Sequence, residues 1–169
     1  DYEEGQYSYR NKTDYPYEDV DGNPFDDRNY IGRPADEWPV ISATVSFPYT
    51  PIFRETADET IKVPAWLNDP IYYHNRGNVS NWDDPEEGTY GDFFGLDDLF
   101  TEHPDVVQGM IDIYKTWVDY GVDGFRVDTV KHVNMEFWQA FAPEILAHAE
   151  NIGNDDFFIF GEVYSGDKV

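Results

Sequence analysis

Apolar and polar positions alternate regularly in the carboxyl-terminal part of the chain, and the pattern predicts helices and strands there. After Pro104, which suits the first turn of a helix, apolar residues recur at helical spacing. The apolar positions of this first helix are Val107, Met110, Ile111, Tyr114, Trp117 and Val118. Gly121 fits the left-handed residue that commonly ends a helix.

A short buried strand is expected over residues 122–128, followed by a second amphipathic helix over residues 134–150. The apolar face of that helix holds Phe137, Phe141, Ile145 and Leu146. The continuous apolar run at residues 157–160 has the composition of a strand that is buried on both faces. Because helix, strand, helix and strand alternate, we expect a parallel α/β arrangement.

Residues 1–95 have a different character, rich in Gly, Pro, Asn, Asp and Tyr and without sustained periodicity. Turns are expected at residues 21–24 and 75–78, and a short strand at residues 41–47. A long irregular segment in a compact protein is usually a functional loop region or a small inserted domain. The sequence therefore suggests two parts, residues 1–95 and residues 96–169.

The amino-acid composition restricts the kinds of molecule that the protein is expected to bind. The 35 acidic residues against 11 basic ones give a net charge of −24, which disfavours nucleic acid and anionic membranes because polyanions bind clustered Lys and Arg. A neutral polysaccharide meets no such repulsion, and the charge also suits a calcium-binding or salt-adapted surface. The absence of Cys excludes disulfides and thiolate metal sites. No apolar run approaches the roughly 20 residues of a membrane span.

The candidate chemistry is a pair of carboxylates, Asp128 and Glu162, that end the two expected strands. Alternate strand residues share a face, so Arg126 points the same way as Asp128. A neighbouring guanidinium keeps a carboxylate ionised, as a nucleophile requires, whereas apolar surroundings favour a protonated carboxyl that can act as an acid. Two carboxylates at neighbouring strand ends are what cleavage of a glycosidic bond needs.

Each carboxylate also has a purely structural interpretation. Arg126 and Asp128 could form an ion pair that closes a strand end, since structural pairs perturb carboxylates as active sites do. Glu162 could simply cap its strand. The occurrence of both carboxylates on adjacent strand ends favours the catalytic interpretation over two independent structural ones.

Three motifs resemble signatures of the α-amylase family of glycoside hydrolases. The sequence GFRVDTVKH at residues 124–132 resembles the second family signature, and FGEV at residues 160–163 resembles the third. The sequence GLDDL at residues 95–99 resembles a short motif that closes the inserted domain of the family. The motifs occur in family order and spacing, so the resemblance is specific over residues 90–169 and looser over residues 1–90.

The resemblance implies an α/β fold, a portion of a (β/α)₈ TIM barrel with an irregular, partly β excursion domain inserted after the third strand. Residues 1–95 would be that insert, and residues 96–169 would run from the third barrel helix to the fifth strand. The first and fourth family signatures are not found in these 169 residues. Since an incomplete barrel cannot close, we expect residues 1–169 to need the remainder of the barrel for stability and activity.

The resemblance also assigns roles to individual residues. Asp128 would be the nucleophile, Glu162 the general acid and base, and Arg126 the group that holds Asp128. Lys131 and His132 would contact the sugar, a pair typical of members that cut α-1,4 links in starch. An α-glucan polysaccharide or oligosaccharide would then be the substrate, and the protein would be secreted.

Residues of the insert have expected roles too. Most of its aromatic side chains should form a small core, while Trp66 and Tyr73 are expected to stack against sugar rings. Many family members hold a structural calcium ion, and Asp98 and the main-chain oxygen of His132 match two of its oxygen ligands. In so acidic a chain, Asp98 could equally be an ordinary surface carboxylate.

Other functions remain compatible with the sequence. An α-glucan transglycosylase, such as a cyclodextrin-forming enzyme, would share both carboxylates and the Lys131–His132 pair. A non-catalytic relative would more often lack the carboxylates. A calcium-binding structural domain is disfavoured because no Asp-x-Asp-x-Asp-Gly loop occurs.

Overall fold

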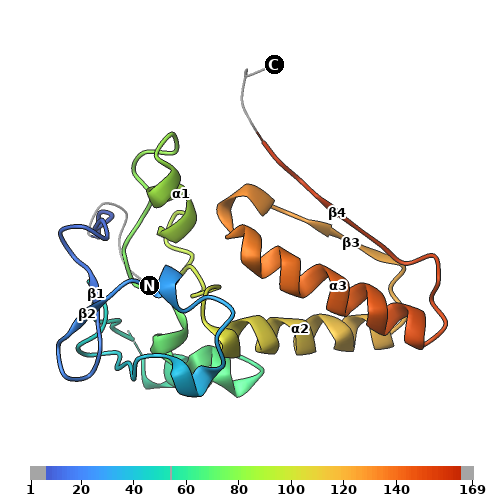
Figure 1. Cartoon of the computed structure of the whole chain (residues 1–169), viewed down its shortest axis with the longest axis horizontal. Coiled ribbons are helices and arrows are strands. Elements are labelled where there is room, and N and C mark those ends of the chain that lie inside the picture. Colours follow the sequence, from blue (N-terminus) through green and yellow to red (C-terminus); the bar gives the residue numbers. More distant parts are fainter. Residues whose placement is uncertain (1–6, 54, 165–169) are drawn as a thin grey trace. The chain divides into compact units, whose positions relative to one another are not determined.

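The computed structural model of the chain describes residues 7–53 and 55–164 (Figure 1). It divides into two compact units, with the boundary between Pro104 and Asp105. Among the described helices, none combines the length and the apolar character that a bilayer crossing demands.

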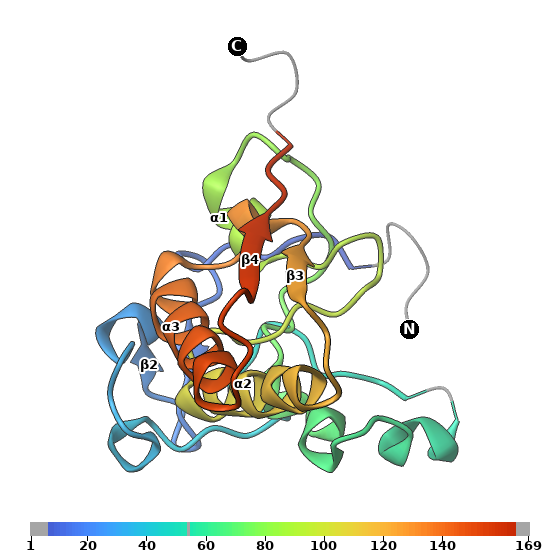
Figure 2. The same ribbon diagram turned by 90° about the vertical axis from the view of Figure 1, so that its right-hand side faces the viewer.

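The second unit is built from two helices and two strands. Helix α2 (Pro104–Asp119) precedes strand β3 (Gly124–Val127), and helix α3 (Met135–Asn151) precedes strand β4 (Phe158–Gly161). The strands pair in parallel, with Gly124 opposite Phe158 and Val127 opposite Gly161 (Figure 2). The predicted order of helix, strand, helix and strand and the parallel pairing are therefore confirmed.

The helix ends follow from local chemistry. The side chain of Asn134 accepts a hydrogen bond from the main-chain N–H of Phe137 at 2.6 Å, which satisfies one of the free donors of the first turn of α3. Gly121, just past the end of α2, has a φ of 88°. This left-handed conformation is the one predicted for it, and it favours glycine because a side chain would be strained there.

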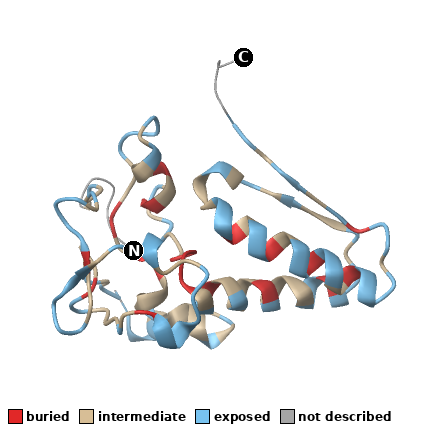
Figure 3. Cartoon of the chain, in the orientation of Figure 1, coloured by how far each residue is buried: buried red, intermediate tan, exposed pale blue. Residues whose placement is uncertain are grey.

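The core of the second unit lies between the facing sides of α2 and α3 (Figure 3). Its buried members are Ile111, Val118, Phe137, Phe141, Ile145, Ala149 and Phe157. Phe125 and Ile159 pack onto it from the strands. Trp117 and Leu146, which were predicted on the buried faces, are 53% and 42% exposed. Each lies one residue from a fully buried position, so the helical rotation of about 100° per residue turns it outward.

Strand β4 is not buried on both faces as its apolar run predicted. Phe158 and Phe160 are 54% and 51% exposed and stack on each other with ring centroids 5.9 Å apart. In the described part of the chain, helices cover only the face of β3 and β4 that carries Phe125 and Ile159. A Cβ at Gly124 would lie 2.6 Å from the carbonyl oxygen of Phe158, so this position requires glycine.

The first unit contains only short elements. Strands β1 (Tyr17–Glu18) and β2 (Pro24–Phe25) form an antiparallel pair, and helix α1 spans Pro85–Tyr90. The described 3₁₀ helices of this unit are Asp27–Asn29, Ala35–Glu37, Thr56–Thr60, Ala65–Asn68 and Pro70–Tyr72.

The strand predicted over residues 41–47 is wrong, because this segment forms turns. The main-chain N–H of Ser42 donates to Oγ of Ser46, and the main-chain N–H of Ser46 donates to the carbonyl of Ser42, both at 2.9 Å. Such local serine hydrogen bonds offer the backbone an alternative to a strand ladder.

Aromatic rings make the core of the first unit, as expected for a segment poor in aliphatic residues. The ring of Phe100 lies 5.1 Å from that of Tyr17, 5.7 Å from that of Trp38 and 5.0 Å from that of His74. All four side chains are buried. This core is unusual in also enclosing charged groups, namely Asp27, Arg76 and Glu102.

Arg76 is fully buried and ties two segments together. Its Nη1 donates to the carbonyl oxygens of Arg10 and Tyr15, each at 3.0 Å, and its guanidinium carbon lies 4.0 Å from the centroid of the Tyr17 ring. The main-chain N–H of Arg10 donates back to the carbonyl of Arg76 at 2.9 Å. The guanidinium therefore fixes the turn at residue 76 against the segment before β1.

This core holds buried groups of both charges. Lys12 forms an ion pair with Asp27, whose side chain is fully buried. Burial raises the pKa of the Tyr17 phenol, and the charges of Arg76, Asp27 and Glu102 act on the same group. Removal of one buried charge should thus leave the opposite charges uncompensated in a medium that solvates them poorly.

We predict that Arg76→Met lowers the free energy of unfolding by about 3–5 kcal/mol, because two hydrogen bonds and a buried cation are lost together. Chemical denaturation of the protein that carries these residues measures the change. Arg33→Met is the matched control, since Arg33 is half exposed and lies 3.7 Å from exposed Glu37. It should cost less than about 0.5 kcal/mol. Equal effects of the two substitutions would show that Arg76 contributes no more than a surface arginine.

Candidate active site

The two predicted carboxylates follow paired residues at the ends of β3 and β4. Val127 lies opposite Gly161 in the parallel ladder, and Asp128 and Glu162 are the next residues on the two strands. The main-chain N–H of Glu162 donates to the carbonyl of Val127 at 2.7 Å, which continues the ladder past the strand end. Because neighbouring strands are about 4.8 Å apart, the main chains of Asp128 and Glu162 lie side by side.

Arg126 and Asp128 share a face of β3, in keeping with their spacing of two residues. The Nη1 atom of Arg126 lies 3.7 Å from Oδ2 of Asp128, and the two side chains are 53% and 68% exposed. Water screens an ion pair with this exposure, so it contributes little to stability.

The backbone turns sharply after Asp128. Thr129 has a left-handed φ of 54°, and a single 3₁₀ turn, η6 (Val130–His132), follows. Val130 lies against the end of β4, since a Cβ at Gly161 would approach its Cγ2 to 2.5 Å. The indole N–H of Trp138, on α3, donates to the carbonyl of Val130 at 3.1 Å, and this hydrogen bond ties the turn to the helix.

Lys131 and His132 are carried by this turn. Lys131 is exposed and His132 is partly buried, and the main-chain N–H of His132 donates to the carbonyl of Thr129 at 2.9 Å. The structure thus brings Arg126, Asp128, Glu162 and the Lys131–His132 turn to one end of the β3–β4 pair.

Trp66 and Tyr73, the predicted sugar contacts, belong to the first unit. The Trp66 ring is partly buried and meets Tyr72 edge to face, with centroids 5.7 Å apart. Tyr73 is only 8% exposed. Its phenol accepts a hydrogen bond from Nζ of Lys62 at 2.9 Å and donates one to the carbonyl of Leu67 at 2.6 Å. Most of the Tyr73 ring is therefore buried in the core of the first unit.

Tyr73 also forms part of the wall of a small hollow within the first unit, whose cavity volume is about 90 Å³. The other aromatic side chains of the wall are Tyr7, Tyr49 and Phe53. Polar side chains of the wall include Lys62, Asn68, Asn75, Asp92 and Asp97.

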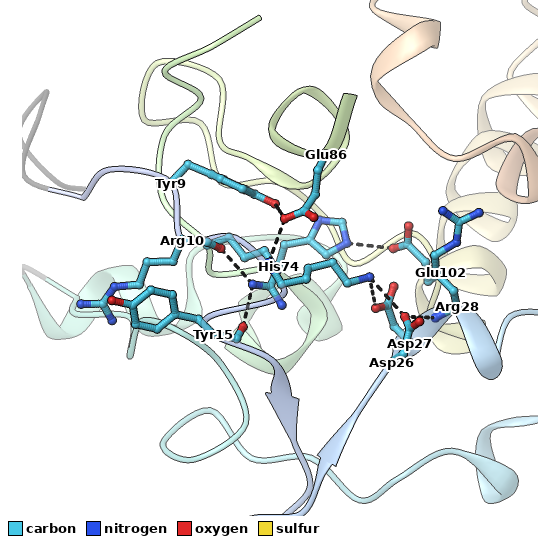
Figure 4. A network of polar contacts seen from close by, with 11 residues as sticks. Tyr9, Arg10, Tyr15, Asp26, Asp27, Arg28, His74, Glu86 and Glu102 are labelled. Atoms are coloured by element: carbon cyan, nitrogen blue, oxygen red, sulfur yellow. Dashed lines mark hydrogen bonds and ion pairs between the residues drawn. The ribbon is translucent and has the colours of Figure 1, made fainter. Parts of the chain in front are cut away.

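Asp98, the predicted metal ligand, is hydrogen-bonded to a fully buried histidine. Its Oδ2 lies 2.7 Å from Nδ1 of His74. On the other side of the ring, Nε2 of His74 lies 2.8 Å from Oε2 of Glu102 (Figure 4). Burial by itself lowers the pKa of His74, but the carboxylates of Glu102 and Asp98 outweigh it and raise the pKa to about 9. Since an ionised carboxylate only accepts hydrogen bonds, the imidazolium donates to both.

The main chain of Asp98 is held as well. Its N–H donates to Oδ1 of Asp92 at 2.8 Å, and its carbonyl accepts a hydrogen bond from the main-chain N–H of His74 at 2.9 Å. Asp92 is 3% exposed, and burial raises the pKa of its carboxyl to about 7.

The donor chemistry of Asp98 suits calcium, which prefers carboxylate and carbonyl oxygens. Calcium takes six to eight such oxygens, however, and no group of three or more His, Asp or Glu residues within residues 7–53 and 55–164 has the arrangement of a metal site. Asp98 belongs to the first unit and His132, the other predicted ligand, to the second.

The sequence pattern did not reveal the pairing of His74 with Glu102. The segment that joins Asp98 to Glu102 is not helical, so their spacing of four residues carries no periodic signal. The side chain of His74 is fully buried.

Comparison with known proteins identifies the family. The sequence profile described as the alpha amylase catalytic domain matches residues 52–169. An alpha-amylase of Streptomyces lividans is 54% identical over 168 residues, which are 99% of this chain and 18% of that protein. A cyclomaltodextrin glucanotransferase of Klebsiella oxytoca is 38% identical over 91 residues, which are 54% of this chain and 14% of that protein.

Solved structures agree. The alpha-amylase of Geobacillus thermoleovorans, in a complex with acarbose, has a TM-score of 0.52 and 38% identity, covering 59% of this chain and 22% of its own. An Anoxybacillus alpha-amylase has a TM-score of 0.52 and 40% identity over 60% of this chain and 22% of its own. The chain thus spans about a fifth of the length of these relatives, whose family has a TIM-barrel catalytic domain. The chain belongs to the alpha-amylase family of glycoside hydrolases, and it corresponds to part of the catalytic domain.

Proposed function

We propose that the protein hydrolyses α-1,4-glucosidic bonds in starch-like α-glucans and retains the configuration of the anomeric carbon. The observation that carries the proposal is the register of β3 and β4, which puts Asp128 and Glu162 at adjacent strand ends. Family relatives named as amylases support the substrate class. The carboxyl ends of parallel strands are also where barrel enzymes place their chemistry.

The proposed mechanism is a double displacement. The carboxylate of Asp128 attacks the anomeric carbon while Glu162 donates a proton to the leaving glycosidic oxygen, and a covalent glycosyl-enzyme forms. Glu162 then removes a proton from water, which displaces Asp128 and releases the sugar. Retaining enzymes need their two carboxyl groups about 5–5.5 Å apart. Adjacent positions on neighbouring parallel strands are compatible with that separation.

The other residues of this strand end have supporting roles in the proposal. Arg126 would orient Asp128 through the contact at 3.7 Å. Lys131 and His132 project from the turn that follows Asp128, where they can donate hydrogen bonds to hydroxyl groups of the bound glucan. Trp66 and Tyr73 of the first unit would contact sugar rings through whatever part of each ring remains accessible.

We further propose that residues 1–95 form an excursion domain inserted after the third strand of the barrel, and that residues 96–169 run from the third barrel helix to the fifth strand. The exposed phenylalanines of β4 support this assignment, since the remaining barrel would cover the face that they occupy. The rest of the barrel would also complete a structural calcium site with Asp98 and the main-chain oxygen of His132. Because the proposed substrate is a polymer, we expect the enzyme to be secreted.

A second candidate is transglycosylation, which the similarity to cyclomaltodextrin glucanotransferases favours. The first displacement would be the same, and a sugar hydroxyl would replace water in the second. A non-catalytic relative is the third alternative. The presence of Arg126, Asp128 and Glu162 in one arrangement argues against it.

We predict that Asp128→Asn and Glu162→Gln each lower kcat on soluble starch by about 1,000-fold or more in the complete enzyme, because each removes a group that reacts. Reducing-end assays measure the loss. Asp123→Asn is a control, since this exposed aspartate precedes β3 at the opposite end of the strand. Near-normal kcat in either test variant would refute the assignment of that carboxylate.

We predict that the complete enzyme cleaves maltoheptaose to products whose new reducing ends are initially in the α configuration, since two inversions restore the starting anomer. Proton NMR in the first minutes of the reaction distinguishes the anomers. Initial β-anomer would mean a single displacement. Cyclic products in the same samples would favour the transglycosylase.

We predict that residues 1–169 expressed alone show no turnover of maltoheptaose, because two strands cannot close a barrel around the substrate. The same NMR assay, at matched molar concentration of the complete enzyme, makes the comparison. Measurable hydrolysis by the isolated chain would show that Asp128 and Glu162 suffice without the rest of the barrel.

A further inference from the structure

The residue that holds Asp98 most directly is His74. Both the side-chain Oδ2 and the main-chain carbonyl of Asp98 accept hydrogen bonds from His74, at 2.7 Å and 2.9 Å. Asp92 fixes the main-chain N–H of Asp98 from a third direction at 2.8 Å. The Asp98 carboxylate therefore has a defined position, although its side chain is still 24% exposed.

His74 is in turn anchored from behind. Its side chain is fully buried, its Nε2 lies 2.8 Å from Oε2 of Glu102, and the Glu102 side chain is also fully buried. The rings of Tyr90 and Phe100 flank the imidazole, each with its centroid 5.0 Å away. The imidazole thus cannot turn without breaking its two side-chain hydrogen bonds and displacing the flanking rings.

Through these contacts, the packed core holds the partly exposed carboxylate of Asp98 in a fixed position. A buried carboxylate, Glu102, fixes the ring plane, and the ring then fixes the carboxylate of Asp98. An ordered ligand binds a cation more tightly than a mobile one because less freedom is lost on binding. Groups that hydrogen-bond to metal ligands affect metal affinity for this reason.

We propose that His74, anchored by Glu102, is a positioning residue that presents the Asp98 carboxylate as a preformed oxygen ligand for a divalent cation such as calcium. The inference rests on the cation-binding role of Asp98 under the proposed function. It adds a relay, defined as the hydrogen-bonded side chains of Glu102, His74 and Asp98, which raises the affinity for the cation. A structural role alone would require His74 for folding but would leave the affinity for calcium unchanged.

Two substitutions separate the links of the relay. The side-chain amide nitrogen of asparagine can occupy the position of imidazole Nδ1, so His74→Asn keeps a donor for Asp98 and loses the link to Glu102. Glutamine instead reaches the position of Nε2, so His74→Gln keeps the link to Glu102 and loses the donor for Asp98. The exposed pair His148–Asp119, with Nε2 and Oδ1 2.7 Å apart, offers a matched control in His148→Gln.

The experiment titrates calcium chloride into the complete, chelator-treated protein and measures binding by calorimetry, with melting temperatures recorded in chelator and in saturating calcium. We expect His74→Gln to weaken calcium binding about tenfold or more. His74→Asn should weaken it less, and His148→Gln should not change it. Both His74 variants should melt at a lower temperature in chelator.

Calcium affinity equal to that of the unmodified protein in His74→Gln, with only a lower melting temperature, would overturn the proposal and leave His74 a structural residue. If His74→Gln does not fold, Glu102→Gln serves instead, because it keeps the shape and weakens only the anchor; unchanged affinity there would overturn the proposal equally. Asp98→Asn tests the underlying assumption separately. Unchanged affinity in Asp98→Asn would refute the cation role of Asp98 itself.

Discussion

The parallel ladder between β3 and β4 is the constraint on which the candidate active site depends. It aligns Val127 with Gly161, so that Asp128 and Glu162 leave the two strands side by side. The ladder needs glycine at two positions, since a side chain at residue 124 would strike the carbonyl of Phe158 and one at residue 161 would strike Val130. Helices α2 and α3 hold the pair in place by covering the face that carries Phe125 and Ile159.

The first unit is stabilised in a different way. Few aliphatic residues are available, and aromatic rings around Phe100 enclose charged groups that hydrogen-bond to the backbone and to one another. Buried charges demand partners with defined geometry, because an uncompensated one is costly. This demand gives order to a unit with very short strands, and it extends to Asp98 through His74 and Glu102.

Sequence periodicity predicted the second unit well because its two helices are long and each buries one side. Both helices end within a few residues of their expected bounds, and Asn134 and Gly121 act at their ends as local chemistry requires. The errors concern positions at the edges of a helical face, such as Trp117 and Leu146, and a segment whose serines bond locally instead of forming a strand. The relay of Glu102, His74 and Asp98 joins residues 24 and 28 positions apart, a contact that no local pattern encodes.

The sequence by itself determined the family and the parallel α/β order of the second unit, and it indicated the two candidate carboxylates, because all three depend on local motifs and on hydrophobic spacing. Only the tertiary structure decided which carboxylates His74 faces, which aromatic rings are buried and how Arg76 joins the segments of the first unit. Those features arise from contacts between residues distant in the chain. Such contacts form only when the backbone has folded, since the same side chains could have met many other partners in an unfolded chain.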